Sequence, residues 1–225
     1  MARTHAEQEP PARVPLTRER VLEAAIALAD EVGLAGLTMR KLAQQLGVEA
    51  MSLYNHVANK DDLLDGMVDL VFAEIGLPAP GVDWKAALRQ RAMAARAVLE
   101  RHRWAIGLME SRSQPGPANL RHHDEVLGCL REAGFSLTNA AHAYSVLDSY
   151  IYGFTLNKQS LPFDTAEEVA ELGRRYLREL LGNQYPYLAE IIVEHAMKPG
   201  YDYADEFAFG LDLILDGLER VRGTA

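Results

Sequence analysis

Apolar residues recur along most of the chain at intervals of three and four positions, the spacing that places them on one face of an α-helix. In the first 80 residues this pattern predicts helices at 17–33, 38–46, 49–56 and 59–75. Thr17, Thr38 and Asn59 are suitable N-caps, and Gly47 can form the turn between the second and third helices.

The segment "GLPAPG" at 76–81 interrupts the helical pattern, and we place a domain boundary there. Beyond it we expect helices at 84–103, 104–111, 119–133, 138–159, 165–181, 187–197 and 203–221. The chain shows no strand-like alternation with hairpin signals. The sequence therefore predicts an all-α protein with a flexible arm at 1–16, a three-helix domain with a linking helix at 17–76, and a larger helical domain at 82–225.

Composition narrows the setting in which the chain works. Of its 225 residues 48% are hydrophobic, and Cys129 is the single cysteine, so no disulfide can form within the chain. No apolar run reaches the length of a membrane span, and the N-terminus lacks the apolar middle of a signal peptide. We therefore expect a soluble, cytoplasmic protein without a membrane partner.

The net charge of −9 does not exclude DNA binding, because the acidic excess lies outside the first domain. Within 38–60 the basic residues are Arg40, Lys41 and Lys60, against the single acid Glu49. A locally positive face on an acidic protein can bind phosphate, since salt limits the reach of the surrounding charges to about 10 Å.

Two helices joined by a turn at Gly47 after a first helix describe a helix-turn-helix unit, whose third helix enters the major groove of DNA. This assignment explains the polar residues of 49–56, because Ser52, Tyr54, Asn55 and His56 would face DNA while Leu53 anchors the helix. The alternative is an ordinary three-helix core with a polar surface. Tyr54 or His56 would then be packing residues.

The stretch "LTRERVLEAAIALADEVGLAGLTMRKLAQQLGVEAMSLYNHVANKDDLLDGM" resembles the DNA-binding domain of TetR-family transcriptional repressors. More weakly, "DWKAALRQRAMAARAVLERHR" and "REAGFSL" resemble the tetracycline-repressor type of C-terminal domain. The resemblance implies a homodimeric, ligand-responsive repressor that binds a double-stranded operator. Carried onto this chain, it implies DNA contacts from Thr38, Arg40, Ala50, Met51, Ser52, Tyr54, Asn55, His56 and Lys60.

Two narrow apolar seams in the C-terminal half have the spacing of helix–helix interfaces. We expect a four-helix dimer interface, as the resemblance implies, formed by Tyr144, Leu147, Ile151, Phe207, Leu211, Ile214 and Leu218. The alternative is that these residues form an intramolecular core.

The resemblance also implies a small-molecule effector, which we expect to be a mostly apolar organic molecule. Candidate wall residues are Trp104, Met109, Tyr150 and Tyr152, and candidate polar contacts are Arg112, Asp148 and Asn157. Met109 stands where the tetracycline-binding members carry a metal-binding histidine, and a thioether is a poor ligand for a hard cation. We therefore expect neither a metal nor another cofactor, and no tight binding of tetracycline.

Other chemistry is not indicated by the sequence. His122 and His123 are adjacent on a predicted helix and point about 100° apart, so we interpret them as an exposed pair. Phosphate loops, nucleophile elbows and zinc spacings are absent from the sequence, and we expect no enzymatic activity. Two alternatives stay open: a helical enzyme or carrier whose three-helix domain does not bind DNA, and a nucleoid-type binder without a ligand. The long C-terminal helices argue against the second.

Overall fold

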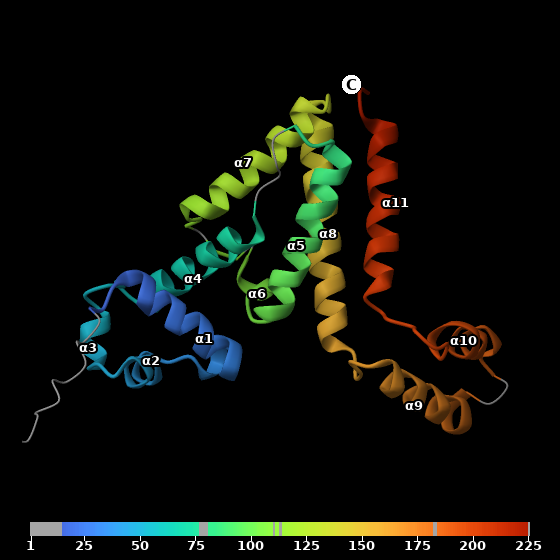
Figure 1. Cartoon of the computed structure of the whole chain (residues 1–225), viewed down its shortest axis with the longest axis horizontal. Helices are drawn as coiled ribbons and strands as arrows, with labels where there is room; N and C mark the ends of the chain where they lie inside the picture. Colours follow the sequence, from blue (N-terminus) through green and yellow to red (C-terminus); the bar gives the residue numbers. More distant parts are fainter. Residues whose placement is uncertain (1–14, 77–80, 110, 113, 182–183, 225) are drawn as a thin grey trace, which may run out of the picture. The chain divides into compact units, whose positions relative to one another are not determined.

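The computed structural model describes the chain except for residues 1–14, 77–80, 110, 113, 182–183 and 225 (Figure 1). Most of the predicted arm at 1–16 lies outside the described residues. The chain divides into two compact units, Met1–Met67 (unit 1) and Val68–Ala225 (unit 2). This division falls inside a helix, before the break at 76–81. No helix in the described part of the chain is long and apolar enough to cross a membrane.

Unit 1 contains the helices α1 (Arg18–Gly36), α2 (Met39–Leu46) and α3 (Ala50–Leu53), and the first half of α4 (Lys60–Ile75). The predicted caps are confirmed: the side chains of Thr17, Thr38 and Asn59 accept hydrogen bonds from the backbone N–H groups of the first helical turns. Helix α1 continues beyond the predicted end at Gly33, where the backbone kinks at a φ of 69°.

The core of unit 1 is formed by apolar residues from all four helices, and α1 and α3 both pack against α2. Its buried members are Val21, Leu22, Ala25, Ile26, Leu28, Ala29, Leu37, Leu42, Ala43, Leu53, Val57, Leu63 and Met67. Burial of Leu53 and Val57 fixes the side of α3 that faces the domain, which leaves its other side exposed.

Unit 2 contains the rest of α4 and the helices α5 (Trp84–Arg101), α6 (Ile106–Met109), α7 (Pro117–Glu132), α8 (Leu137–Ser160), α9 (Ala166–Tyr176), α10 (Pro186–Ile191) and α11 (Asp205–Val221). Two π-helical turns, η1 (Leu177–Leu181) and η2 (Ile192–Ala196), extend α9 and α10. Helix α8 packs against α5, α7 and α11, and Figure 1 shows α5, α8 and α11 running alongside one another.

Aromatic and cationic side chains link α5, α8 and α11. The buried Arg96 of α5 donates a hydrogen bond to the Ala204 carbonyl at 3.0 Å, and its guanidinium lies 5.0 Å from the ring centroid of Phe207 on α11. The Tyr150 hydroxyl of α8 donates to the carbonyls of Glu206 and Phe207. Tyr150 therefore anchors α11 to α8.

The predicted dimer seam requires a correction. Leu147, Ile151, Phe207 and Leu211 are no more than 1% exposed within the single chain, Leu218 is also buried, and Tyr144 and Ile214 are half-buried. These side chains are covered by helices of their own unit, so the fully buried ones cannot face a second copy. The five buried residues therefore belong to the core of unit 2, which was the alternative that the sequence left open, whereas Tyr144 and Ile214 stay candidates for the dimer interface.

Candidate DNA-binding and effector sites

The exposed side of α3 carries large side chains that a single chain does not cover. Met51 is 74% exposed and Tyr54 is 45% exposed, whereas Leu53 between them is completely buried. Asn55 is exposed, and Ala50, Ser52 and His56 are half-buried. Helix α3 is shorter than the predicted 49–56, because the residues after Leu53 form turns. Tyr54 is thus not a core residue, whereas the half-buried His56 can still be a packing residue.

The turn before α3 is set by local backbone geometry. Gly47 adopts the left-handed region, with φ 66° and ψ 33°, and ends α2. The Val48 N–H then donates to the Ala43 carbonyl at 3.0 Å, which closes the turn. Glycine suits this position because a side chain would be strained at positive φ.

Exposed basic residues lie on α2 and α4, the helices before and after α3 in the chain. Arg40 and Lys41 in the first turn of α2 are exposed, as is Lys60 at the start of α4, and Thr38 is also exposed. The first backbone N–H groups of a helix add a partial positive charge that favours phosphate. Helix α3 and the helices next to it in the chain therefore carry exposed cations together with polar and apolar side chains of the size that reaches base edges.

The predicted effector residues have different surroundings. Trp104, Met109 and Asp148 are buried, Arg112, Tyr150 and Tyr152 are half-buried, and Asn157 is exposed. Asp148 and Tyr150 are two positions apart on α8 and point to opposite sides of the helix. Asp148 therefore lies against α5, whereas Tyr150 bonds to α11.

His122 is not the exposed residue that the sequence suggested, which is a second correction. It is fully buried, and its Nε2 accepts a hydrogen bond from Nε of the buried Arg91 at 3.0 Å. Burial, together with the nearby charges of Arg91 and His123, lowers the pKa of His122 to about 3. Neither Arg91 nor His122 is among the residues that the sequence predicts for a site. Their polar character on apolar helix faces was the only available signal.

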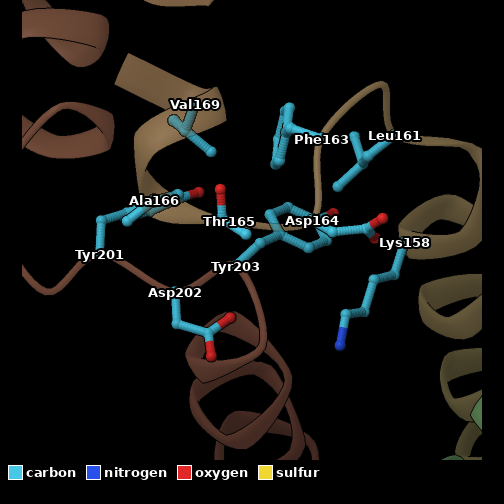
Figure 2. A pocket seen from close by; sticks show the side chains of 10 residues that line it. All are labelled: Lys158, Leu161, Phe163, Asp164, Thr165, Ala166, Val169, Tyr201, Asp202 and Tyr203. Carbon is cyan, nitrogen blue, oxygen red and sulfur yellow. The ribbon is translucent and has the colours of Figure 1, made fainter. Parts of the chain in front are cut away.

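A separate cavity of about 230 Å³ lies where α8 gives way to α9. Figure 2 shows Leu161 and Phe163 on the loop between these helices, with Tyr201 and Tyr203 on the segment that precedes α11. None of the seven predicted effector residues lines this cavity. The described residues hold no group of three or more histidine, cysteine, aspartate or glutamate side chains arranged to bind a metal.

Each of the two parts of the chain matches the model of a known protein family. Residues 21–67 match the family model "Bacterial regulatory proteins, tetR family", and residues 77–222 match "Tetracyclin repressor-like, C-terminal domain". The chain is 36% identical over 221 residues to the HTH-type transcriptional repressor DrrR1 of Streptomyces coeruleorubidus, covering 93% of this chain and 80% of that one.

Two solved structures with bound small molecules are also similar. One is the TetR family protein ActR of Streptomyces coelicolor in complex with actinorhodin, with a TM-score of 0.74 and 29% identity over 93% of this chain and 100% of that chain. The other is a TetR variant of Acinetobacter baumannii in complex with minocycline, with a TM-score of 0.67 and 28% identity over 93% and 96%. The chain therefore belongs to the tetR family of bacterial regulatory proteins and is a ligand-responsive, DNA-binding regulator of the repressor type.

Proposed function

We propose that two copies of this chain bind a near-palindromic operator, with α3 of each copy in the major groove of one half-site. The observation that carries this proposal is the exposure of Met51 on α3 and of Tyr54 directly after it, beside the completely buried Leu53. Met51, Ser52, Asn55 and His56 then meet base edges, with Ala50 beside them. The phosphate contacts come from Thr38, Arg40, Tyr54 and Lys60. Arg40 can also contact a base edge.

The dimer face that we propose lies on the exposed sides of α8 and α11. Four large apolar side chains there, Val146, Leu156, Phe209 and Leu213, are 46–66% exposed in the single chain. Apolar residues grouped on two neighbouring helices favour burial against a partner. Two-fold symmetry would bring both helices of each copy together and match the two half-sites of a palindrome.

The effector that we propose is an organic molecule of moderate size that binds within unit 2 and releases the operator. Actinorhodin and minocycline in the two solved relatives support this choice. Release requires the effector to bind the DNA-incompetent state more tightly, because a ligand with equal affinity for both states shifts nothing. We also propose that the chain has no enzymatic activity and acts in the cytoplasm, where its operator is accessible.

Selection of bound duplexes from random DNA tests this function. We expect enrichment of a near-palindrome whose half-sites are centred about one helical turn apart or slightly more. A double variant, Met51→Ala with Tyr54→Ala, is the matched control, because both side chains are exposed and their loss leaves the core intact. Recovery of no common sequence, or equal enrichment by the control variant, would contradict the assignment of α3 as the DNA-reading helix.

A further inference from the structure

The cavity at the junction of α8 and α9 has two walls that come from distant parts of the chain. Leu161, Phe163 and Val169 follow one another from the end of α8 into α9, whereas Tyr201 and Tyr203 precede α11 (Figure 2). Val169 is buried and the other four residues are half-buried in the single chain. The volume of about 230 Å³ is several times the roughly 30 Å³ of a water molecule. This space, which we call the α8–α9 cavity, therefore has room for a small organic molecule.

The tyrosine wall of the α8–α9 cavity is held in place by other rings of unit 2. The ring of Tyr203 stacks on that of Phe154, with centroids 5.1 Å apart and planes 15° from parallel. The ring of Tyr201 meets that of His195 edge to face, with centroids 5.1 Å apart. A wall that is already ordered loses little conformational entropy on binding, which raises the affinity for a molecule that fits.

Two carboxylates line the same cavity, from Asp164 before α9 and from Asp202 between the two tyrosines. Within the described part of the chain, neither of these side chains forms an ion pair. Asp202 Oδ1 accepts a hydrogen bond from the Ala204 N–H at 2.8 Å, which fixes the orientation of this carboxylate. Burial raises the pKa of the Tyr201 hydroxyl, and the negative charges of Glu206 and Asp202 raise it further. The cavity thus lies in a region of negative charge.

The positive groups that the structure describes at the cavity are already paired. Lys158 Nζ lies 2.9 Å from Glu100 Oε1. At the start of α9, the Glu168 carboxylate accepts hydrogen bonds from the backbone N–H groups of Asp164 and Thr165 at 2.7 and 3.1 Å. The charge of Glu168 offsets the partial positive charge that the N-terminus of a helix otherwise presents to an anion. These pairs disfavour an anionic ligand and leave the two aspartates to select a cation.

We propose that the α8–α9 cavity binds a protonated primary amine that carries a compact apolar body. The ammonium group offers three N–H donors to the carboxylates of Asp164 and Asp202. It also lies against the tyrosine wall, because the faces of aromatic rings attract cations. The apolar body packs against Leu161 and Phe163, since a pocket commonly combines apolar walls with a few polar groups that fix the orientation of its ligand.

This amine site is separate from the effector site that the sequence predicts. None of the seven predicted effector residues lines the α8–α9 cavity. The inference therefore does not depend on the proposed binding of an operator or on its release, and it is tested without DNA.

Three compounds with the same ring test the proposal on the full-length protein by isothermal titration calorimetry at neutral pH. The probe is cyclohexylmethylamine, which is protonated under these conditions. Cyclohexylmethanol has nearly the same shape without the charge, and cyclohexanecarboxylate carries the opposite charge. We expect the amine to bind about tenfold more tightly than the alcohol, because two partly screened carboxylates and a cation–π contact each add a few-fold. The carboxylate should bind more weakly than the alcohol.

A double variant shows whether the two aspartates cause this preference. Asp164→Asn combined with Asp202→Asn changes two exposed side chains, and asparagine at 202 can still accept the hydrogen bond from the Ala204 N–H. We expect this variant to bind the amine and the alcohol equally. The control, Glu167→Gln combined with Asp205→Asn, removes the same charge from exposed positions outside the cavity and should keep the preference.

A third variant locates the binding. Ala166→Phe places a large side chain in the lining of the cavity and should weaken binding of the amine at least about tenfold, with circular dichroism as the check on folding. No binding of the amine to the wild-type chain, or equal binding of amine and alcohol, would overturn the proposal. So would a preference that persists in the Asp164→Asn, Asp202→Asn variant, a preference that the control also loses, or unchanged binding in a folded Ala166→Phe variant.

Discussion

Arg18 of α1 donates hydrogen bonds to both carboxylate oxygens of Asp62 in α4, at 3.0 Å from Nη1 and 2.6 Å from Nη2. The same Nη1 donates to the carbonyl of His56 at 2.8 Å, and Asp62 accepts a further bond from the Ala58 N–H at 2.7 Å. The guanidinium of Arg18 holds the pKa of the Asp62 carboxyl below its usual range. The end of the α3 segment is thereby held between α1 and α4 within unit 1.

We predict that Asp62→Ala weakens operator binding although it removes a negative charge. Charge alone would raise the affinity for DNA, so a loss of affinity must come from a displaced α3. The pair is partly exposed, and its loss should lower the free energy of unfolding by no more than about 1 kcal/mol. Operator titration and urea denaturation measure the two effects. Glu23→Ala, which removes an exposed acid from α1, is the control, and equal affinities of the two variants would contradict a positioning role.

The exposed residues near α3 should separate into two groups. Alanine at Arg40, Tyr54 or Lys60 should weaken operator binding by about 1–3 kcal/mol each if the contact is well formed. Changes at Met51 or Asn55 should instead alter the preferred sequence. Tyr54→Phe keeps the exposed ring and removes only the hydroxyl, so it isolates the phosphate contact. Operator titration at several salt concentrations measures both groups, and wild-type behaviour of all five positions would exclude α3 as the reading helix.

Two neighbouring leucines of α11 distinguish the dimer face from the core. Leu213 is 59% exposed and Leu211 is completely buried. Leu213→Glu should therefore yield a folded monomer, whereas Leu211→Glu should destabilise unit 2 by more than about 3 kcal/mol, because it buries an unpaired carboxylate. Analytical ultracentrifugation and circular dichroism measure assembly and folding. A dimer that survives Leu213→Glu would place the interface elsewhere.

Leu211 and Leu213 also show which features of the fold could be predicted from the sequence and which could not. Caps such as Thr17 and Thr38, and the turn at Gly47, depend on neighbouring backbone groups and could be predicted from local sequence. The side of α11 that is buried depends on α5 and α8, which are distant in the chain. Helical spacing marks an apolar stripe without identifying its partner. For the same reason the sequence could not reveal that His122 meets Arg91.

His122 should make the protein less stable in acid. Its pKa in the folded chain is about 3, below the ordinary value of 6.5, so protonation favours the unfolded chain. Above about pH 6.5 His122 is neutral in both states and does not lower the free energy of unfolding. As the pH falls from 6.5 towards 3, its protonation in the unfolded chain lowers that free energy. Between pH 7 and 4.5 this group should lower the free energy of unfolding by roughly 2–3 kcal/mol.

Urea denaturation of His122→Gln at both pH values tests that loss, since glutamine can still accept the Arg91 hydrogen bond without titrating. His142→Gln, at an exposed position of α8, is the control for replacing a histidine. Between pH 7 and 4.5 the wild-type chain and the His142→Gln variant should lose more free energy of unfolding than the His122→Gln variant. The same loss in all three proteins would show that His122 does not carry the effect.

Tetracycline with magnesium should fail to release this protein from its operator at micromolar drug concentrations. Met109 is buried at the position where the resemblance to tetracycline-binding members would require a metal-binding histidine, and a thioether binds Mg²⁺ poorly. Fluorescence anisotropy of operator-bound protein, titrated with the drug in the presence of Mg²⁺ or EDTA, measures release. We expect no magnesium-dependent release from the wild-type chain. Release at micromolar tetracycline that EDTA abolishes would show that the chain chelates the drug through other residues, and would contradict an effector site that works without a metal.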